Sequence, residues 1–121
     1  MIFQSIRIKE GLYERTFRFA SGVNLIFSKE NSRGKTTLLR FMLYSLGYSI
    51  PNTRNIQFDR CEVETHLLCE KAGDVLLTRL SKDYIEVAIE KETTTYILPD
   101  QLHELHEILF GTANADILNN I

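Results

Sequence analysis

The stretch that decides the fold is Phe27-Ser-Lys-Glu-Asn-Ser-Arg-Gly-Lys-Thr-Thr-Leu-Leu39, in which an apolar segment leads into a Gly-Lys-Thr turn. A strand that feeds such a turn, which then opens a helix, is an arrangement in which proteins hold phosphate groups. Backbone N–H groups of the turn point inward, and the helix N-terminus adds its positive dipole end. The chain is therefore expected to bind the phosphates of a nucleoside triphosphate.

The residue types in this turn have physical roles in phosphate binding. Gly34 lets the backbone approach the phosphates, because it has no side chain. Lys35 is expected to reach the β- and γ-phosphates, and the Thr36 hydroxyl is expected to ligate Mg²⁺. The predicted cofactors are thus ATP and Mg²⁺. The predicted nucleotide-binding residues are Lys29, Asn31, Ser32, Arg33, Gly34, Lys35, Thr36 and Thr37.

The residues on either side of the turn supply the strand and the helix that this interpretation requires. The segment Gly22-Val-Asn-Leu-Ile-Phe27 is apolar and bounded by turn residues, which predicts a short buried strand at 23–27. Residues 35–46 predict a helix that ends at Gly47. The first position of the usual G-x-x-x-x-G-K-[ST] pattern is Lys29 rather than glycine. The alternative is a helix N-terminus that holds no ligand.

Length and composition are those of one globular domain. The chain has 121 residues, of which 44% are hydrophobic and 25% are charged, so one core of moderate size is expected. No apolar stretch approaches the roughly 20 residues that cross a bilayer, so a cytoplasmic location and no membrane partner are predicted. Cys61 and Cys69 lie in one predicted strand, too far apart to form a disulfide, and are predicted to be reduced core thiols.

Most of the remaining sequence alternates with a period of two, which is typical of β-strands. Residues 2–9, with Ile2, Ile6 and Ile8 on one face, and residues 14–19 predict a hairpin. Further strand candidates, separated by short turns, lie at 61–68, 75–80, 84–89 and 94–98. This succession favours an antiparallel meander.

A second helix is expected after the meander. Asp100 is expected to cap it, and Gly111 to end it. Its apolar face carries Leu102, Leu105, Ile108 and Leu109. The expected fold class is therefore mixed α+β, with the antiparallel meander packed beside the phosphate-loop strand and helix.

The order of these motifs resembles the N-terminal lobe of ABC-type ATPase heads and, in layout, the SMC, Rad50 and RecF-like proteins. The motifs that carry the resemblance are the N-terminal hairpin, Gly22-Val-Asn-Leu-Ile26, Asn31 before Gly-Lys-Thr, and Leu38-Leu-Arg40 in the helix. The resemblance covers residues 1–60 by motif and 61–110 by element order. It implies a P-loop NTPase fold and places the first hairpin, with Tyr13 and Arg15, near the adenine. A plain surface turn is the alternative for these two residues.

The resemblance also implies that residues 1–121 are a single partial domain, the N-terminal lobe of a head. The sequence contains no apolar run ending in Asp-Glu and no Ser-Gly-Gly signature. In the family both belong to a C-terminal lobe, and two heads enclose two ATP molecules. We therefore expect binding in this chain, and hydrolysis only in the complete, dimerised protein. The expected association is a homodimer of heads or contact with the C-terminal lobe of the same protein. No catalytic residue is assigned.

The family further implies a DNA-associated role, in genome maintenance or in defence against foreign DNA. The net charge of −2 argues against a surface dominated by polyanion binding. A local patch remains compatible with several arginines that lie in the first half of the chain, among them Arg15, Arg18, Arg33, Arg40, Arg54 and Arg60. The alternative function is a nucleotide-sensing interaction module with little turnover. A small GTPase- or kinase-like enzyme is disfavoured by the antiparallel strands, because such enzymes alternate strand and helix.

Two other groups of residues carry weaker signals. His103 and His106 have the i, i+3 spacing that binds metals on helices, but a polar, solvent-facing helix side is the favoured interpretation. Glu62 and Glu64 share a strand face, which alternation predicts to be solvated rather than an acid pair.

Overall fold

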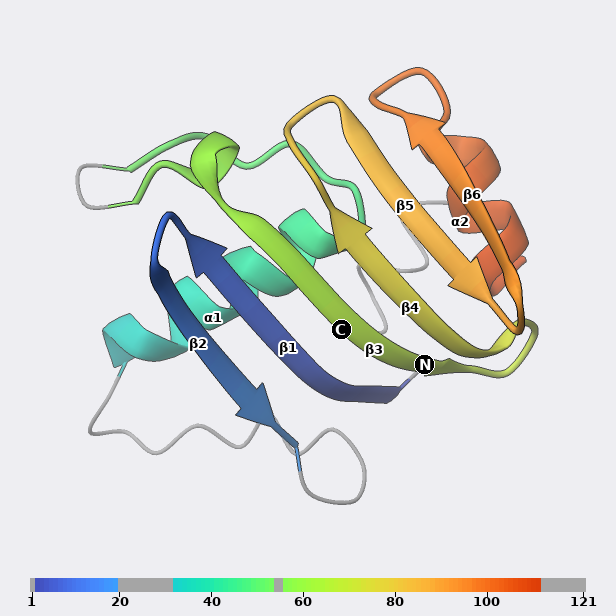
Figure 1. The fold of residues 1–121 in the computed structure, drawn as a ribbon, viewed down its shortest axis with the longest axis horizontal. Helices are drawn as coiled ribbons and strands as arrows, with labels where there is room; N and C mark the ends of the chain where they lie inside the picture. The colour runs from blue at the N-terminus through green and yellow to red at the C-terminus, as the bar shows by residue number, and fades with distance from the viewer. Residues whose placement is uncertain (1, 20–31, 54–55, 112–121) are drawn as a thin grey trace.

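The computed structural model describes residues 2–19, 32–53 and 56–111. Six strands, two α-helices and one short 3₁₀ helix make up this part of the chain (Figure 1). In chain order they are β1 (Ile2–Glu10), β2 (Tyr13–Arg18), α1 (Ser32–Ser45), η2 (Phe58–Arg60), β3 (Glu62–Cys69), β4 (Gly73–Arg79), β5 (Tyr84–Ile89), β6 (Glu92–Ile97) and α2 (Leu102–Phe110).

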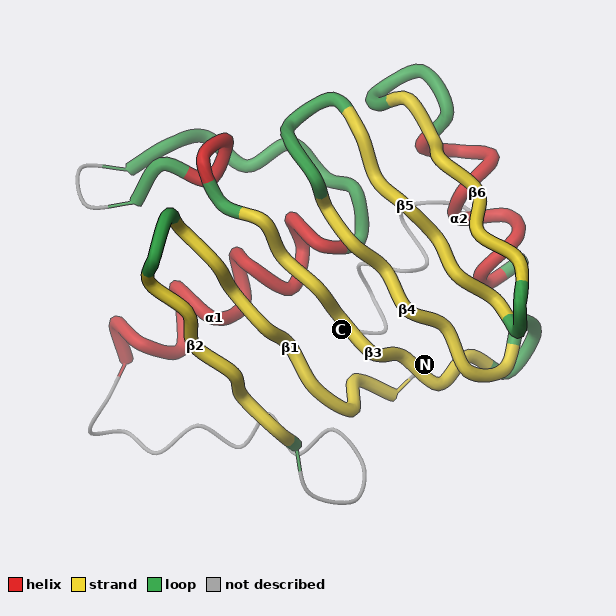
Figure 2. The backbone as a smooth tube through the Cα atoms, in the orientation of Figure 1, coloured by secondary structure: helices red, strands yellow, loops and turns green. Residues whose placement is uncertain are grey.

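The six strands form one antiparallel sheet in the order β2-β1-β3-β4-β5-β6. Both helices lie on the same side of it, behind the sheet in Figure 1. The tube in Figure 2 shows how short turns join most neighbouring strands, as the hairpin and the meander predict. The mixed α+β class is therefore confirmed. The predicted phosphate-loop strand at 23–27 lies outside the described residues.

The first strand departs from the predicted alternation. A register shift between Phe3 and Ser5 interrupts the pairing of β1 with β3. Such a bulge places an extra residue in one strand and reverses the faces beyond it. Phe3 is consequently buried with Ile6 and Ile8, whereas Ile2 is exposed. The assignment of Ile2 to the apolar face is thus wrong.

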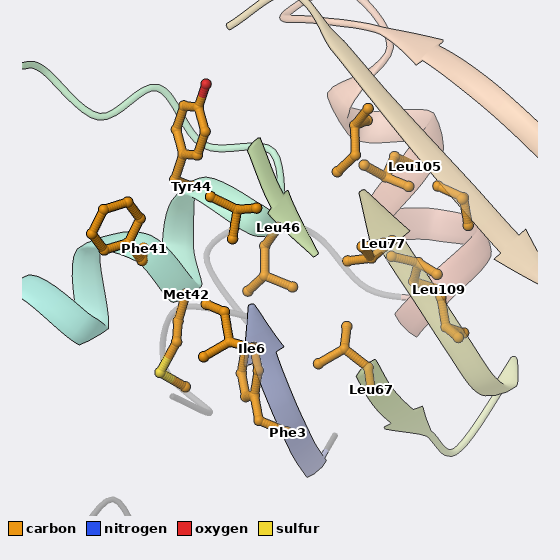
Figure 3. Packing of buried hydrophobic residues seen from close by; sticks show 14 of the residues in the cluster. Phe3, Ile6, Phe41, Met42, Tyr44, Leu46, Leu67, Leu77, Leu105 and Leu109 are labelled. Carbon is orange, nitrogen blue, oxygen red and sulfur yellow. The ribbon is translucent and has the colours of Figure 1, made fainter. Parts of the chain in front are cut away.

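One hydrophobic core fills the space between the sheet and the helices. Figure 3 shows Ile6 of β1 beside Met42 and Leu46, which come from α1 and the turn after it. At the other end of the core, Leu77 of β4 lies beside Leu109 of α2. Burial of each such side chain contributes about 1.5–3 kcal/mol to stability. The core therefore holds both helices against the sheet.

The start of α2 differs from the prediction, whereas its end agrees. Gln101, not Asp100, occupies the N-cap position, and it makes no side-chain cap hydrogen bond. Gln101 instead binds the preceding strand, because its Oε1 accepts a 2.8 Å hydrogen bond from the Ile97 N–H. Gly111 adopts a left-handed conformation with φ 66°, and its N–H donates to the Glu107 carbonyl. This αL C-cap confirms the predicted end.

Neither α1 nor α2, the helices in the described part of the chain, combines the length and hydrophobicity that crossing a bilayer requires.

Candidate phosphate-binding site

The Gly-Lys-Thr sequence lies in the first turns of α1. The helix begins at Ser32, three residues before the predicted start, and runs for 14 residues. Arg33, Gly34 and Lys35 are therefore helical, Thr36 is exposed and Thr37 is half-buried. Lys29 and Asn31, which the motif also predicts as ligands, lie outside the described residues. The structure thus places the second half of the motif at a helix N-terminus.

The chemistry of this helix start favours an anion. The first four N–H groups of an α-helix have no partner within the helix, and they form the positive end of its dipole. The first turn of α1 has no acidic residue. The sequence instead supplies two cations there, Arg33 and Lys35. Cations at the positive end of a helix are unfavourable, and an anion such as phosphate would offset that cost.

The first hairpin presents side chains on the same side of the sheet as α1. Arg15 lies opposite Ile8 in the pairing of β1 with β2, and Tyr13 lies opposite Glu10. Directly opposed residues project to one face of a sheet, and Ile8 is buried on the helical face. Tyr13 and Arg15 therefore project toward the side that α1 covers, where Tyr13 is 65% exposed. In Figure 1 the first turn of α1 extends past β2 on this side.

The opposite end of α1 is attached to the sheet by a buried arginine. Arg79 of β4 is 1% exposed. Its Nη1 donates to the carbonyl oxygens of Tyr44, at 2.7 Å, and Tyr48, at 3.2 Å. Its Nε donates to the Ser81 carbonyl at 2.7 Å, and its Nη2 to the Lys82 carbonyl at 2.6 Å. One guanidinium thus joins the end of α1 to the turn between β4 and β5.

Arg79 also supplies a charge that α1 itself lacks. The last turn of α1 contains no basic residue. A cation stabilises the negative end of the helix dipole, and Arg79 provides it from β4. Burial lowers the pKa of the Arg79 guanidinium, yet an arginine in a protein keeps its proton. Within the described residues, no carboxylate forms an ion pair with Arg79. Its hydrogen bonds there go to backbone carbonyls, and its guanidinium also lies over the Tyr44 ring.

Sequence reasoning missed Arg79, although a signal was present. Val75, Leu77 and Arg79 follow one another at every second position of a strand. Alternation therefore places Arg79 on the core face. What holds it there was not visible in the sequence, because its hydrogen-bond partners are backbone atoms rather than acidic side chains.

The end of α1 has a second anchor in α2. His106 is fully buried, and its Nε2 lies 2.7 Å from the Leu46 carbonyl oxygen. A carbonyl only accepts hydrogen bonds, so Nε2 carries a proton. The rings of Tyr48 and Phe110 flank the imidazole, at 5.2 and 5.9 Å between centroids. His106 therefore holds the turn that follows α1.

The two histidines of α2 do not form a metal pair. His103 is exposed, as predicted, and lies 3.4 Å from the Glu107 carboxylate. The solvent-facing prediction is wrong for His106, because that residue borders the apolar stripe and packs on the end of α1. Over residues 2–19, 32–53 and 56–111, no group of three His, Cys, Asp or Glu side chains has a metal-binding arrangement.

The remaining ionisable groups singled out in the sequence have structural surroundings. Cys61 and Cys69 are buried free thiols, as predicted. Burial raises the pKa of Cys61 to about 12 and that of Cys69 to about 11, so neither is a ready nucleophile.

Glu64 pairs with Arg7 across β1 and β3 on the open face of the sheet, and Arg7 also lies 3.5 Å from Glu14. Glu64 therefore has an arginine as its partner, which agrees with the prediction that Glu62 and Glu64 are not an acid pair.

Comparison with known proteins gives a partial similarity to a longer protein. A stretch of 53 residues is 42% identical to the Lamassu protein LmuB of Bacillus sp. strain NIO-1130. The similarity covers 41% of this chain and 9% of that protein, so the chain spans less than a tenth of its relative's length. No family model matches the chain.

Proposed function

We propose that the chain is the ATP-binding N-terminal lobe of an SMC/Rad50-like ATPase head. The observation that carries the proposal is the position of Gly34, Lys35 and Thr36 in the first turns of a 14-residue helix whose first turn lacks acidic residues. The antiparallel sheet on one side of this helix agrees with the element order of such a lobe.

In this proposal the chain's own groups bind and orient the nucleotide. Backbone N–H groups at the start of α1 donate to phosphate oxygens, and Lys35 neutralises part of their charge. The Thr36 hydroxyl holds Mg²⁺, a cation that prefers oxygen ligands. When bound, Mg²⁺ neutralises charge on the phosphates. Tyr13 and Arg15 lie on the helical side of the sheet and are proposed to flank the base.

Hydrolysis is proposed to need more than this chain. Phosphoryl transfer depends on positioning, on charge stabilisation and on a group that orients the attacking water. Lys35 and Thr36 serve the first two requirements, and no residue here is assigned to the third. Turnover is therefore proposed for a complete protein, in a homodimer of heads or in contact with a C-terminal lobe.

The proposed setting is a DNA-associated protein that acts in defence against foreign DNA or in genome maintenance. The partial similarity to the Lamassu protein LmuB is compatible with an SMC-like head and with defence. DNA contacts of the full-length protein would go to phosphates, without sequence preference and with a steep salt dependence. Filter binding with and without ATP tests this part. An absence of DNA binding, or of any ATP effect on it, favours the nucleotide-sensing module instead.

Calorimetric titration of ATP with Mg²⁺ tests the binding site. Lys35→Ala removes a charge-assisted contact that typically contributes about 1.5–3 kcal/mol, so affinity should fall roughly 10- to 150-fold. Lys91→Ala is the matched control. Lys91 lies exposed in the turn between β5 and β6, and its substitution removes the same charge far along the chain from the predicted phosphate-binding residues. Thr36→Val should make the remaining ATP binding insensitive to Mg²⁺. Equal affinity of wild type and Lys35→Ala would refute the site.

A turnover assay tests the assignment to a partial head. The 121-residue chain should hydrolyse ATP no faster than background. Lys35→Ala controls for contaminating ATPases. If the chain hydrolyses ATP steadily and Lys35→Ala abolishes this hydrolysis, the assignment is contradicted. Carboxylates such as Asp59 and Asp74 would then become the candidate catalytic groups.

A further inference from the structure

Among the described side chains of α1, those near the C-terminal end are buried, and those that follow the Gly-Lys sequence are more exposed. Phe41, Met42 and Tyr44 are buried, whereas Thr36 is exposed and Leu38 is half-buried. The helix is about 21 Å long at 1.5 Å per residue, and its first turn extends past the edge of the sheet in Figure 1. Because an α-helix is a rigid rod, a shift of its C-terminal end is carried to its first turn.

The apolar contacts of α1 do not by themselves define its position along the helix axis. Hydrophobic association is non-directional and responds to buried area. Hydrogen bonds have a preferred distance and angle, so they define position more sharply. Arg79 directs such bonds to the carbonyl oxygens of Tyr44 and Tyr48, one within the last turn of α1 and one just beyond it.

The guanidinium is itself held in place from the other side. Its Nε and Nη2 donate to the carbonyl oxygens of Ser81 and Lys82, in the turn that follows β4. Strand β4 is an interior strand between β3 and β5. The planar fork of Arg79 therefore links an interior strand to the helix end in a fixed geometry, which the flexible ammonium of a lysine does not reproduce.

A requirement for stability alone does not account for an arginine at this position. Removing a charge from water costs free energy, and well-packed apolar residues often stabilise a core equally well. What the guanidinium adds is direction. We propose that Arg79 is a positioning residue for the phosphate-binding turn: it fixes α1 along its axis and thereby sets where the N–H groups at the start of the helix lie. The inference rests on the proposed function of that turn.

The test compares ATP affinity with folding stability in two kinds of variant. Arg79→Lys keeps the charge and loses the fork, and Arg79→Gln keeps planar donors in case the lysine variant does not fold. Leu109→Ala is the control, since it opens a cavity beside α2 and leaves Arg79 intact. ATP affinity is measured at a temperature well below the thermal unfolding midpoint of each variant. Under these conditions every variant is folded, so a residue that affects only stability does not change the affinity.

The expected result is a loss of ATP affinity of about tenfold or more in the Arg79 variant, with wild-type affinity in Leu109→Ala. A tenfold loss of affinity corresponds to about 1.4 kcal/mol of binding free energy. Wild-type affinity in a folded Arg79 variant would overturn the inference and leave the proposed function intact. Equal losses in the Arg79 variant and in Leu109→Ala would show a general effect of stability and also overturn it.

A second measurement does not depend on the nucleotide. Amide NMR shifts of residues 33–37 report the surroundings of the first turn of α1 in the free protein. These shifts should change in the Arg79 variant, although Arg79 contacts the opposite end of the helix. They should stay at wild-type values in Leu109→Ala. Unchanged shifts in the Arg79 variant would refute the positioning role. Failure of wild type to bind ATP would refute the proposed function separately.

Discussion

The guanidinium of Arg79 lies 4.1 Å from the ring centroid of Tyr44, and its Nη1 donates a 2.7 Å hydrogen bond to the carbonyl oxygen of the same residue. One cation thus binds both the side chain and the backbone of a residue in the last turn of α1. A desolvated cation–π contact contributes about 2 kcal/mol, and a hydrogen bond to a charged group about 1.5–3 kcal/mol. The end of α1 is therefore attached to β4 by directional contacts in addition to apolar packing.

Tyr44→Phe should leave the free energy of unfolding within about 0.5 kcal/mol of wild type. The substitution keeps the ring beneath Arg79 and removes a hydroxyl that is buried without a hydrogen-bond partner in the described part of the chain. Tyr44→Leu, which removes the ring, should cost about 1–3 kcal/mol through the lost cation–π contact and altered packing. Urea unfolding measures both. A large loss in Tyr44→Phe would mean that the hydroxyl has a stabilising partner.

Gly47→Ala should destabilise the protein strongly. Gly47 has φ 105°, and a Cβ there would lie 2.7 Å from Cδ1 of Leu102. Backbone strain of about 1–3 kcal/mol then adds to a clash with α2. Gly73→Ala is the control, because Gly73 has φ 77° but nothing within 4 Å of the added Cβ. Thermal unfolding should show the larger loss for Gly47→Ala, and equal losses would mean that the contact with Leu102 relaxes freely.

His106→Leu should cost about 1–3 kcal/mol, because it leaves the buried Leu46 carbonyl oxygen without its donor. His106→Gln, whose amide can also donate, should recover part of this loss. His103→Leu is the surface control and should change stability by less than about 0.5 kcal/mol. Urea unfolding ranks the variants. Nitrogen-15 NMR of wild type should show a proton on Nε2 of His106, and a neutral ring protonated at Nδ1 alone would contradict the assigned hydrogen bond.

The native thiols should resist alkylation at pH 8. Burial raises the pKa of Cys61 from 9.0 to about 12, which lowers its thiolate fraction by about three orders of magnitude. Iodoacetamide should therefore modify Cys61 and Cys69 rapidly in urea and slowly in buffer, as mass spectrometry can follow. Rapid labelling of the folded protein would contradict the buried positions of the two thiols.

The same two thiols predict a loss of stability at alkaline pH. Above about pH 9 the unfolded chain releases thiol protons that the folded protein retains up to about pH 11–12. The folded state then binds more protons, so the free energy of unfolding falls as pH rises through this window. Burial also raises the pKa values of Tyr44, Tyr48 and Tyr96, which act in the same direction. Replacing both cysteines with alanine should reduce the slope without abolishing it.

Local features of the fold were predictable from neighbouring residues. Alternation with a period of two predicted every strand of the meander, because the side chains of a strand must face the core and the solvent in turn. Gly111 predicted the end of α2, because an αL cap favours glycine. The helix after Gly-Lys-Thr was predicted, but its start at Ser32 was missed by three residues. Asp100 was a wrong cap, because the Gln101 side chain binds Ile97 and the helix begins beyond it.

By itself, the sequence determined the six described strands, the two described α-helices and the placement of Gly34, Lys35 and Thr36 at a helix N-terminus, since each depends on residues within a few positions. Only the tertiary structure decided the pairing of β1 with β3, the burial of His106 and the role of Arg79. Arg79 and Tyr44 are 35 positions apart, and His106 and Leu46 are 60 apart. Both side chains bind backbone carbonyl oxygens, which every residue carries. Such partners leave no mark in the sequence, so folding alone selects them.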